Sequence, residues 1–376
     1  MTHTRLVLNF PGFEKTPVGH QLDRIRHGAE KTAALWDYRN RRIDIEDRPA
    51  ESCAVSRWQS EGDGWTVETR LVQFDWHDII ETYENAPHPR AFFANFPKFL
   101  AFFADGTVAR YFRHAKRYFG FTIFPLLLIG AFFAVALALT LGVAGLAGSG
   151  SIAAWLVALP VALAATLLLC KWPGERFYLL LTVNDWGFAR DMVNRSNPLI
   201  EERYRRFARV LAREISGGRH DDIVVAGHSF GAVWAVAALA LALQENPALL
   251  AGRKAVFLAL GSSLLKIAFA PGAQFMRDWT ARIAAEPGVF WHEIQTKDDL
   301  IAFYKADPFA ALGIAPLRAG LKIERIRFRD SMDKSRYRAM RKSFYRTHRQ
   351  YILYQDKRVA HDYLNRLFGP AAQRQG

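Results

Sequence analysis

The stretch that decides the fold is "DDIVVAGHSFGAVWAVAALALAL", residues 221–243. An apolar run at residues 223–226 leads into Gly227-His228-Ser229-Phe230-Gly231, and an alanine-rich segment of helical character follows it. A G-x-S-x-G run arises easily by chance. A strand before it and a helix after it, however, are typical of a tight turn that lifts a nucleophilic serine above a sheet. The pattern therefore predicts a nucleophile at Ser229, and a glycine-bordered turn with an incidental serine is the alternative.

The segments on either side of this stretch predict the rest of a sheet. From residue 221 onward, strand-like and helix-like runs alternate, which is typical of a parallel sheet covered by helices. We therefore expect an α/β fold with a mostly parallel sheet flanked by helices. The expected strands lie at residues 5–10, 254–263, 288–295 and 321–330, with a hairpin at 53–76 and helices at 19–36 and 198–215.

Two uncharged apolar runs interrupt this pattern, at residues 121–143 and 152–170. At about 1.5 Å per residue, the first run is long enough to cross a hydrocarbon core of roughly 30 Å. The second is near the lower length limit and contains Pro160, so a buried soluble hairpin is the alternative to a two-helix transmembrane hairpin. The aromatic segment at residues 89–106 is expected either at the membrane surface or as a packed core helix.

The charges that flank the apolar runs predict the orientation. Both outer ends are basic and the connection "AGLAGSGS" is uncharged, so the positive-inside rule places both ends in the cytoplasm. The expected protein is a two-helix, multi-pass protein of the inner membrane with everything else on the cytoplasmic side. The basic residues are Arg110, Arg113, Lys116, Arg117, Lys171 and Arg176.

Composition narrows the function classes for this 376-residue chain. The formal charge of +14 suits an anionic inner leaflet as partner, and no helix-turn-helix, zinc-ligand set or RNA-binding signature supports nucleic acid. Two cysteines give no disulfide framework, and no ligand spacing indicates a metal or another cofactor.

We divide the chain into an N-terminal part of the sheet domain (1–118), the hairpin insertion (119–171) and a C-terminal part with the reactive residues (172–376).

At the serine motif, the chain resembles the α/β-hydrolase superfamily, most closely its lipase- and esterase-like serine hydrolases. The resemblance implies that an acid and then a histidine follow Ser229 in the chain. The loop after the strand at 288–295 offers Asp299, with Asp298 as the alternative acid. After the last expected strand, His348 matches the family's H-x-x-Tyr pattern, and His361 is the alternative base.

Two other histidines fit this order poorly. His292 precedes the acid, and His228 is expected to be structural and to point away from the site.

The same resemblance implies an oxyanion hole of two backbone N–H groups. Phe230 follows the nucleophile and supplies one donor. The other comes from the loop "NFPGFE", through Phe13 or Gly12. Pro11 stands where lipases often have histidine, and an ordinary Pro-Gly turn is the alternative.

These residues together predict a membrane-anchored serine hydrolase that cleaves carboxylic esters, including lipid or amphipathic acyl esters, through an acyl-enzyme on Ser229. A thioesterase or acyltransferase would use the same three residues, and a non-catalytic membrane scaffold would use none of them. The sequence indicates no particular acyl chain length, physiological substrate or oligomeric state.

Overall fold

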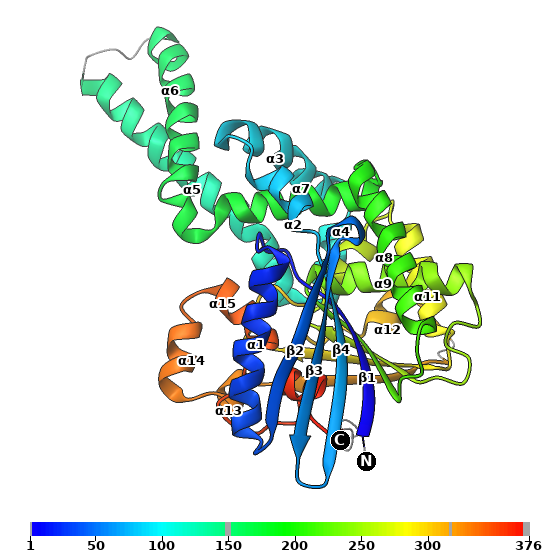
Figure 1. Cartoon of the computed structure of the whole chain (residues 1–376). Helices are drawn as coiled ribbons and strands as arrows, with labels where there is room; N and C mark the ends of the chain where they lie inside the picture. Colours follow the sequence, from blue (N-terminus) through cyan, green and yellow to red (C-terminus); the bar gives the residue numbers. More distant parts are fainter. Residues whose placement is uncertain (1, 147–151, 316–317, 371–376) are drawn as a thin grey trace.

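The computed structural model describes residues 2–146, 152–315 and 318–370, and these form one eight-stranded sheet with helices on both faces (Figure 1). The strand order across the sheet is β2-β3-β4-β1-β5-β6-β7-β8. The strands are β1 (Thr2–Phe10), β2 (Arg39–Arg48), β3 (Cys53–Gly62), β4 (Trp65–Phe74), β5 (Asp222–His228), β6 (Ala255–Leu260), β7 (Val289–Thr296) and β8 (Gly320–Ile326).

The sheet is mixed but mostly parallel. Strand β3 runs antiparallel to β2 and β4, and every other neighbouring pair is parallel. The predicted α/β class and mostly parallel sheet are confirmed. The edge strand β2 was not predicted, because its sequence RNRRIDIEDR is strongly charged and most of its side chains are exposed. Since β1–β4 and β5–β8 share one sheet, the segments before and after the apolar runs fold together.

The helices divide between the two faces of the sheet and an apolar extension. They are α1 (Val18–Leu35), α2 (His77–Glu84), α3 (His88–Ala104), α4 (Thr107–His114), α5 (Lys116–Leu146), α6 (Ile152–Lys171), α7 (Leu179–Asn194), α8 (Pro198–Ser216), α9 (Phe230–Glu245), α10 (Leu264–Ala268), α11 (Gln274–Ala284), α12 (Pro308–Leu312), α13 (Phe328–Ser331), α14 (Lys334–Met340), α15 (Phe344–Arg349) and α16 (Tyr363–Phe368), with 3₁₀ turns η1 (Pro49–Glu51), η2 (Gly174–Phe177) and η3 (Gln350–Ile352).

Alternation along the central strands builds a core on each face. Leu8 of β1 and Val225 of β5 belong to the larger core, which packs against α7, α8, α9 and α11. Val7 and Val224 point to the opposite face and pack against α1 and α16. Figure 1 shows α1 on one side of the sheet and α8, α9 and α11 on the other. The loops at the carboxyl ends of β1, β5 and β6 are therefore held between two packed layers.

Helices α5 and α6 pack against each other and project away from the sheet (Figure 1). Among the described residues, α5 is the one helix long and apolar enough to cross a membrane, and only 6% of its most apolar window is buried. The described apolar part of α6, Trp155–Lys171, is shorter. The expected connection between them includes residues 147–151, which lie outside the described residues.

The aromatic segment at residues 89–106 forms α3, which packs against α7. Asn95 Nδ2 donates a hydrogen bond to Asn184 Oδ1 at 3.0 Å, and a Cβ at Gly187 would come within 2.1 Å of Asn95 Oδ1. The glycine therefore allows the two helices to approach closely. One face of α3 is buried, as expected for a packed core helix. Phe93 and Leu100, on the same helix, are exposed.

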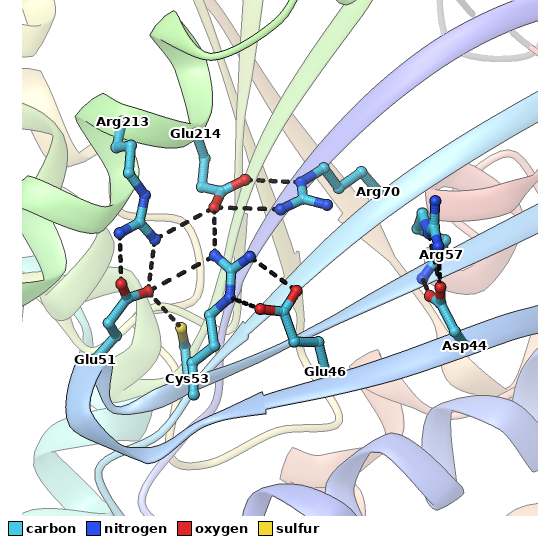
Figure 2. Close-up of polar contacts among 9 residues, drawn as sticks. Asp44, Glu46, Glu51, Cys53, Arg57, Arg70, Arg213 and Glu214 are labelled. Carbon is cyan, nitrogen blue, oxygen red and sulfur yellow. Dashed lines mark hydrogen bonds and ion pairs between the residues drawn. The ribbon is translucent and has the colours of Figure 1, made fainter.

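A network of ion pairs ties α8 to the antiparallel part of the sheet (Figure 2). The buried Glu214 carboxylate accepts from Arg48 Nη1 at 2.9 Å and from Arg70 Nε at 2.7 Å. Burial alone would raise the pKa of Glu214, but the hydrogen bond from Arg70 and the surrounding arginine charges hold it below its ordinary value. A carboxylate of α8 thus neutralises arginines of β2 and β4 inside the protein. Cys53 lies beside this network, and burial raises the pKa of its thiol to about 12.

A buried carboxyl in the middle of β7 makes fold stability depend on pH. Burial raises the pKa of Glu293 from 4.5 to about 8, and Trp291 Nε1 donates to Glu293 Oε2 at 3.0 Å. Between pH 4.5 and about 8, Glu293 stays protonated in the folded state but is ionised in the unfolded chain. Its contribution to stability is therefore complete below pH 4.5 and lost as the pH rises towards about 8.

We predict that Glu293→Gln stabilises the protein at pH 8 but not at pH 5, because glutamine stays neutral at both values. The gain in unfolding free energy should grow by at most about 1.4 kcal/mol per pH unit across this interval. Thermal unfolding followed by tryptophan fluorescence measures it. An equal shift in Tm at both pH values would contradict the assignment.

Candidate active site

Ser229 occupies a strained turn between β5 and α9. Its φ of 57° and ψ of −123° are unusual for a residue other than glycine, so the surrounding structure must hold it there. The Ser229 N–H donates to Leu260 O at 3.0 Å, and Ser229 O accepts from Ala232 N and Ser263 N, each at 3.1 Å. The end of β6 and the start of α10 thus fix the backbone of the serine.

The two glycines of the motif allow this turn to pack. A Cβ at Gly227 would lie 2.5 Å from Ala232 Cα, and a Cβ at Gly231 would lie 2.0 Å from Phe10 O. Both partners are backbone atoms, which cannot move aside as a flexible side chain can. The two glycines therefore permit the close packing of this turn, and the second is required by the end of β1.

His348 and Asp299 form a buried hydrogen-bonded pair. The His348 Nδ1–H donates to Asp299 Oδ2 at 2.7 Å, and Asp299 Oδ1 accepts from Ile301 N at 2.8 Å. Asp299 follows β7 and His348 lies on α15, so parallel neighbours β7 and β8 bring the loops that carry them together. With Nδ1 holding the proton, Nε2 is left as an acceptor.

Ser229 and His348 line the same cavity of about 60 Å³. His348 Nε2 is buried and has no hydrogen-bond partner among the described residues. Ser229 Oγ lies 3.2 Å from Ser263 Oγ, its hydrogen-bonded neighbour in this structure. Hydrogen bonds between a nucleophile and its base are often long in the free protein and shorten with substrate bound. The cavity therefore contains a serine hydroxyl and a buried imidazole acceptor, and the Asp299 carboxylate orients the imidazole from behind the cavity lining.

Phe13 and Phe230 line this cavity from opposite loops, and their rings pack at a centroid distance of 6.0 Å. Neither backbone N–H donates a hydrogen bond within the described part of the chain. Trp76 Nε1 donates to Pro11 O at 3.0 Å and thereby fixes the loop that carries Phe13. Phe230 begins α9, so the positive end of that helix dipole lies beside Ser229 and favours negative charge there.

His228 also lines the cavity, contrary to the expectation that it points away. Its Nε2–H donates to the backbone carbonyl of His348 at 2.9 Å. Burial and the neighbouring His348 hold the pKa of His228 well below its ordinary value, so the ring is neutral. A Cβ on Gly12 would lie 2.9 Å from His228 Nδ1, which shows how closely the loops meet. The role of His228 is structural, but it is exerted on the backbone of His348.

The alternative acid and base lie elsewhere. Asp298 accepts from Phe328 N and Tyr337 OH, each at 3.1 Å, and so holds the chain after β8. His361 lies beside Glu324, with 3.9 Å between His361 Nδ1 and Glu324 Oε1, and burial lowers its pKa to about 4. Within the described residues neither side chain is hydrogen-bonded to Ser229 or His348, whereas Asp299 is bonded to His348.

The cavity contains residues that sequence reasoning missed. Ser263 comes shortly after β6, at the end of the stretch 254–263 that was predicted as a strand, and this position near the carboxyl end of a strand is a signal that could have found it. Asp185 and Lys266 gave no signal, because each lies in an apolar helical segment.

A larger cavity of about 540 Å³ adjoins the first and shares Phe13, Glu14, Tyr345 and Arg349 with it.

The described residues contain no group of three or more His, Cys, Asp or Glu side chains that could hold a metal ion. A scan of protein-family models and searches of curated proteins and solved structures matched nothing to this chain. The interpretation of the cavity therefore rests on its own geometry.

The geometry distinguishes the two neighbouring aspartates. We predict that Asp299→Asn slows the reaction of Ser229 with a fluorophosphonate probe by about 10³–10⁴-fold, because the amide cannot hold His348 in the same tautomer. Asp298→Asn should slow it by less than about tenfold. Labelling rates measured by quenched-flow gel assay test this. Equal effects of the two substitutions would contradict the assignment of Asp299.

Proposed function

We propose that this protein is a serine hydrolase of the α/β-hydrolase type that cleaves carboxylic esters through an acyl-enzyme on Ser229. The observation that best supports the proposal is the buried His348, which lines one cavity with Ser229, is hydrogen-bonded to Asp299 through Nδ1, and has no partner for Nε2 among the described residues. The strained turn adds support, because such strain persists mainly where function requires it.

In the first half-reaction, His348 Nε2 accepts the hydroxyl proton of Ser229 as Oγ bonds to the ester carbonyl carbon. The carbonyl electron pair moves to oxygen, and the N–H groups of Phe13 and Phe230 hold the resulting anion. When the carbonyl re-forms, the bond to the alcohol oxygen breaks. The departing alcohol takes the proton from His348, while Asp299 stabilises the imidazolium.

The second half-reaction repeats these steps with water. A water molecule gives a proton to His348 Nε2 and its oxygen bonds to the acyl carbon. The bond to Ser229 Oγ then breaks, and Oγ regains the proton from His348. The products are a carboxylic acid and a free enzyme, and each of the named residues returns to its starting protonation state.

We also propose that α5, together with α6, anchors the protein in a membrane with the catalytic cavity on the cytoplasmic side. Side chains such as Leu127, Leu139 and Leu156 are exposed on these helices, and exposed apolar surface of this extent is unfavourable in water. The 20 residues of α6 would span about 30 Å as a helix. Basic residues at the start of α5 and the end of α6 support the cytoplasmic orientation.

The position of the anchor favours a lipid or amphipathic ester as substrate. Phe121 of α5 packs against Phe344 at a centroid distance of 5.5 Å, and Phe344 begins the helix that carries His348. Tyr178 follows α6 closely and lines the larger cavity. A substrate that reaches the cavity from the membrane surface would therefore pass beside this contact.

We predict that Ser229→Ala abolishes hydrolysis of 4-nitrophenyl esters of every acyl length, because it removes the hydroxyl that carries the acyl group. The matched control is Ser216→Ala, at the exposed end of α8, which should keep wild-type kcat/KM. The assay is release of nitrophenol by purified protein. Equal hydrolysis by the Ser229→Ala variant would contradict the function.

The membrane proposal predicts that two arginines in the middle of α5, Val135→Arg with Leu139→Arg, release the protein from membranes. Each arginine at a helix centre costs about 2.5–3.5 kcal/mol of insertion free energy. The matched control places arginines at Ile43 and Ile45, which are exposed apolar residues of β2. The measurement is the fraction that stays in the membrane pellet after an alkaline wash. Full retention of the α5 variant would contradict insertion.

A further inference from the structure

The cavity that contains Ser229 holds a second charged pair, which the proposed mechanism does not use. Lys266 of α10 donates from Nζ to Asp185 Oδ2 of α7 at 2.8 Å. Lys266 is 2% exposed and Asp185 is 7% exposed, and both line the cavity. Burial raises the pKa of Asp185 and lowers the pKa of Lys266, and each charge is favoured by the other.

The pair lies close to the nucleophile. The backbone N–H of Lys266 donates to Ser263 O at 3.0 Å, and Ser263 Oγ is the neighbour of Ser229 Oγ. Lys266 Nζ lies 4.9 Å from the ring centroid of Phe230 and 4.0 Å from that of Trp186. The ammonium group is thus held among aromatic rings, one of which belongs to the residue after the nucleophile.

One oxygen of Asp185 lacks a donor. Asp185 Oδ1 is buried and accepts no hydrogen bond from the described residues. A buried acceptor without a donor is destabilising. Replacing a buried ion pair by apolar side chains of similar size is often neutral or stabilising, so folding alone gives no reason for this pair among aromatic residues. A buried charged pair in a cleft beside a nucleophile is instead typical of a functional site.

The chemistry of the pair selects its ligand. Lys266 already neutralises Asp185, so a second cation would be repelled by the ammonium group. An anion would be repelled by the carboxylate. A hydroxyl group fits both partners, because it donates to Asp185 Oδ1 and accepts from one of the two remaining N–H groups of Lys266. The cavity of about 60 Å³ has room for a small group of this kind near the reacting carbonyl.

We propose that Asp185 and Lys266 bind a hydroxyl group of the substrate, so that the enzyme selects esters that carry a hydroxyl two or three bonds from the scissile ester group. This inference rests on the proposed ester hydrolysis. Asp185 determines the specificity by accepting the hydrogen bond, and Lys266 positions the carboxylate and completes the contact. The hydroxyl belongs to either the acyl or the alcohol part of the ester, and the test separates these two sources.

The experiment compares two matched pairs of esters on the full-length protein. The first pair is 4-nitrophenyl 3-hydroxybutyrate and 4-nitrophenyl butyrate, which differ by a hydroxyl on the acyl part. The second is 1-butyrylglycerol and propyl butyrate, which differ in the alcohol part. We expect kcat/KM to favour the hydroxylated ester at least tenfold in one pair, which identifies the side that the site binds.

The variant Asp185→Leu/Lys266→Met removes both charges and keeps the side-chain sizes. We expect it to bring the hydroxyl preference close to one, mainly by raising KM for the hydroxylated ester. Lys98→Met is the matched control, because Lys98 forms an ion pair with Asp191 of the same helix α7 at 2.6 Å and does not line the cavity. This control should keep the wild-type preference.

Each outcome bears on a different proposal. Hydrolysis of all four esters by the wild type without a preference in either pair overturns the hydroxyl site alone. A double variant that slows hydroxylated and plain esters equally also overturns it, because the pair is then only structural. If no ester is hydrolysed and Ser229 does not react with a fluorophosphonate, the proposed function fails. Should the double variant not fold, the wild-type ratios still decide the matter.

Discussion

The close approach of the Ser229 turn to the ends of two neighbouring strands is the constraint on which the cavity depends. Gly231 lies against the carbonyl of Phe10 at the end of β1, while the backbone of Ser229 is hydrogen-bonded to Leu260 and Ser263 at the end of β6. These contacts hold a strained backbone that a free chain would not adopt. Because β1, β5 and β6 are adjacent and parallel, their carboxyl ends bring the loop of Phe13, the serine and the start of α10 together.

The other half of the cavity comes from the loops after β7 and β8. They supply Asp299 and His348, and His228 joins the two halves through its hydrogen bond to the His348 carbonyl. The apolar helices reach the same place, since Phe121 packs on the helix of His348. Ser229 and His348, the hydroxyl site proposed for Asp185 and Lys266, and the proposed membrane contact therefore lie in one connected part of the structure.

The sequence alone predicted the features that depend on a local pattern of residues. The strand before Ser229 and the helix after it are continuous apolar runs on either side of the glycine motif, and the order of Asp299 and His348 followed from a resemblance that needs no distances. Strand β2 was missed because an edge strand can remain charged. Asp185 and Lys266 lie 81 residues apart in apolar helices, so only tertiary packing brings them together. The inward position of His228 was mispredicted for the same reason: its partner is the backbone of a distant residue.

In the proposed reaction, Ser229 forms a covalent acyl intermediate with an ester carbonyl. The most direct measurement is mass spectrometry of the protein quenched with acid during turnover of 4-nitrophenyl butyrate, followed by proteolysis and peptide sequencing. The expected result is a peptide that contains Ser229 and carries the mass of one butyryl group, and the adduct should be absent from the Ser229→Ala variant. Hydrolysis without an adduct, or an adduct on another residue, would contradict it.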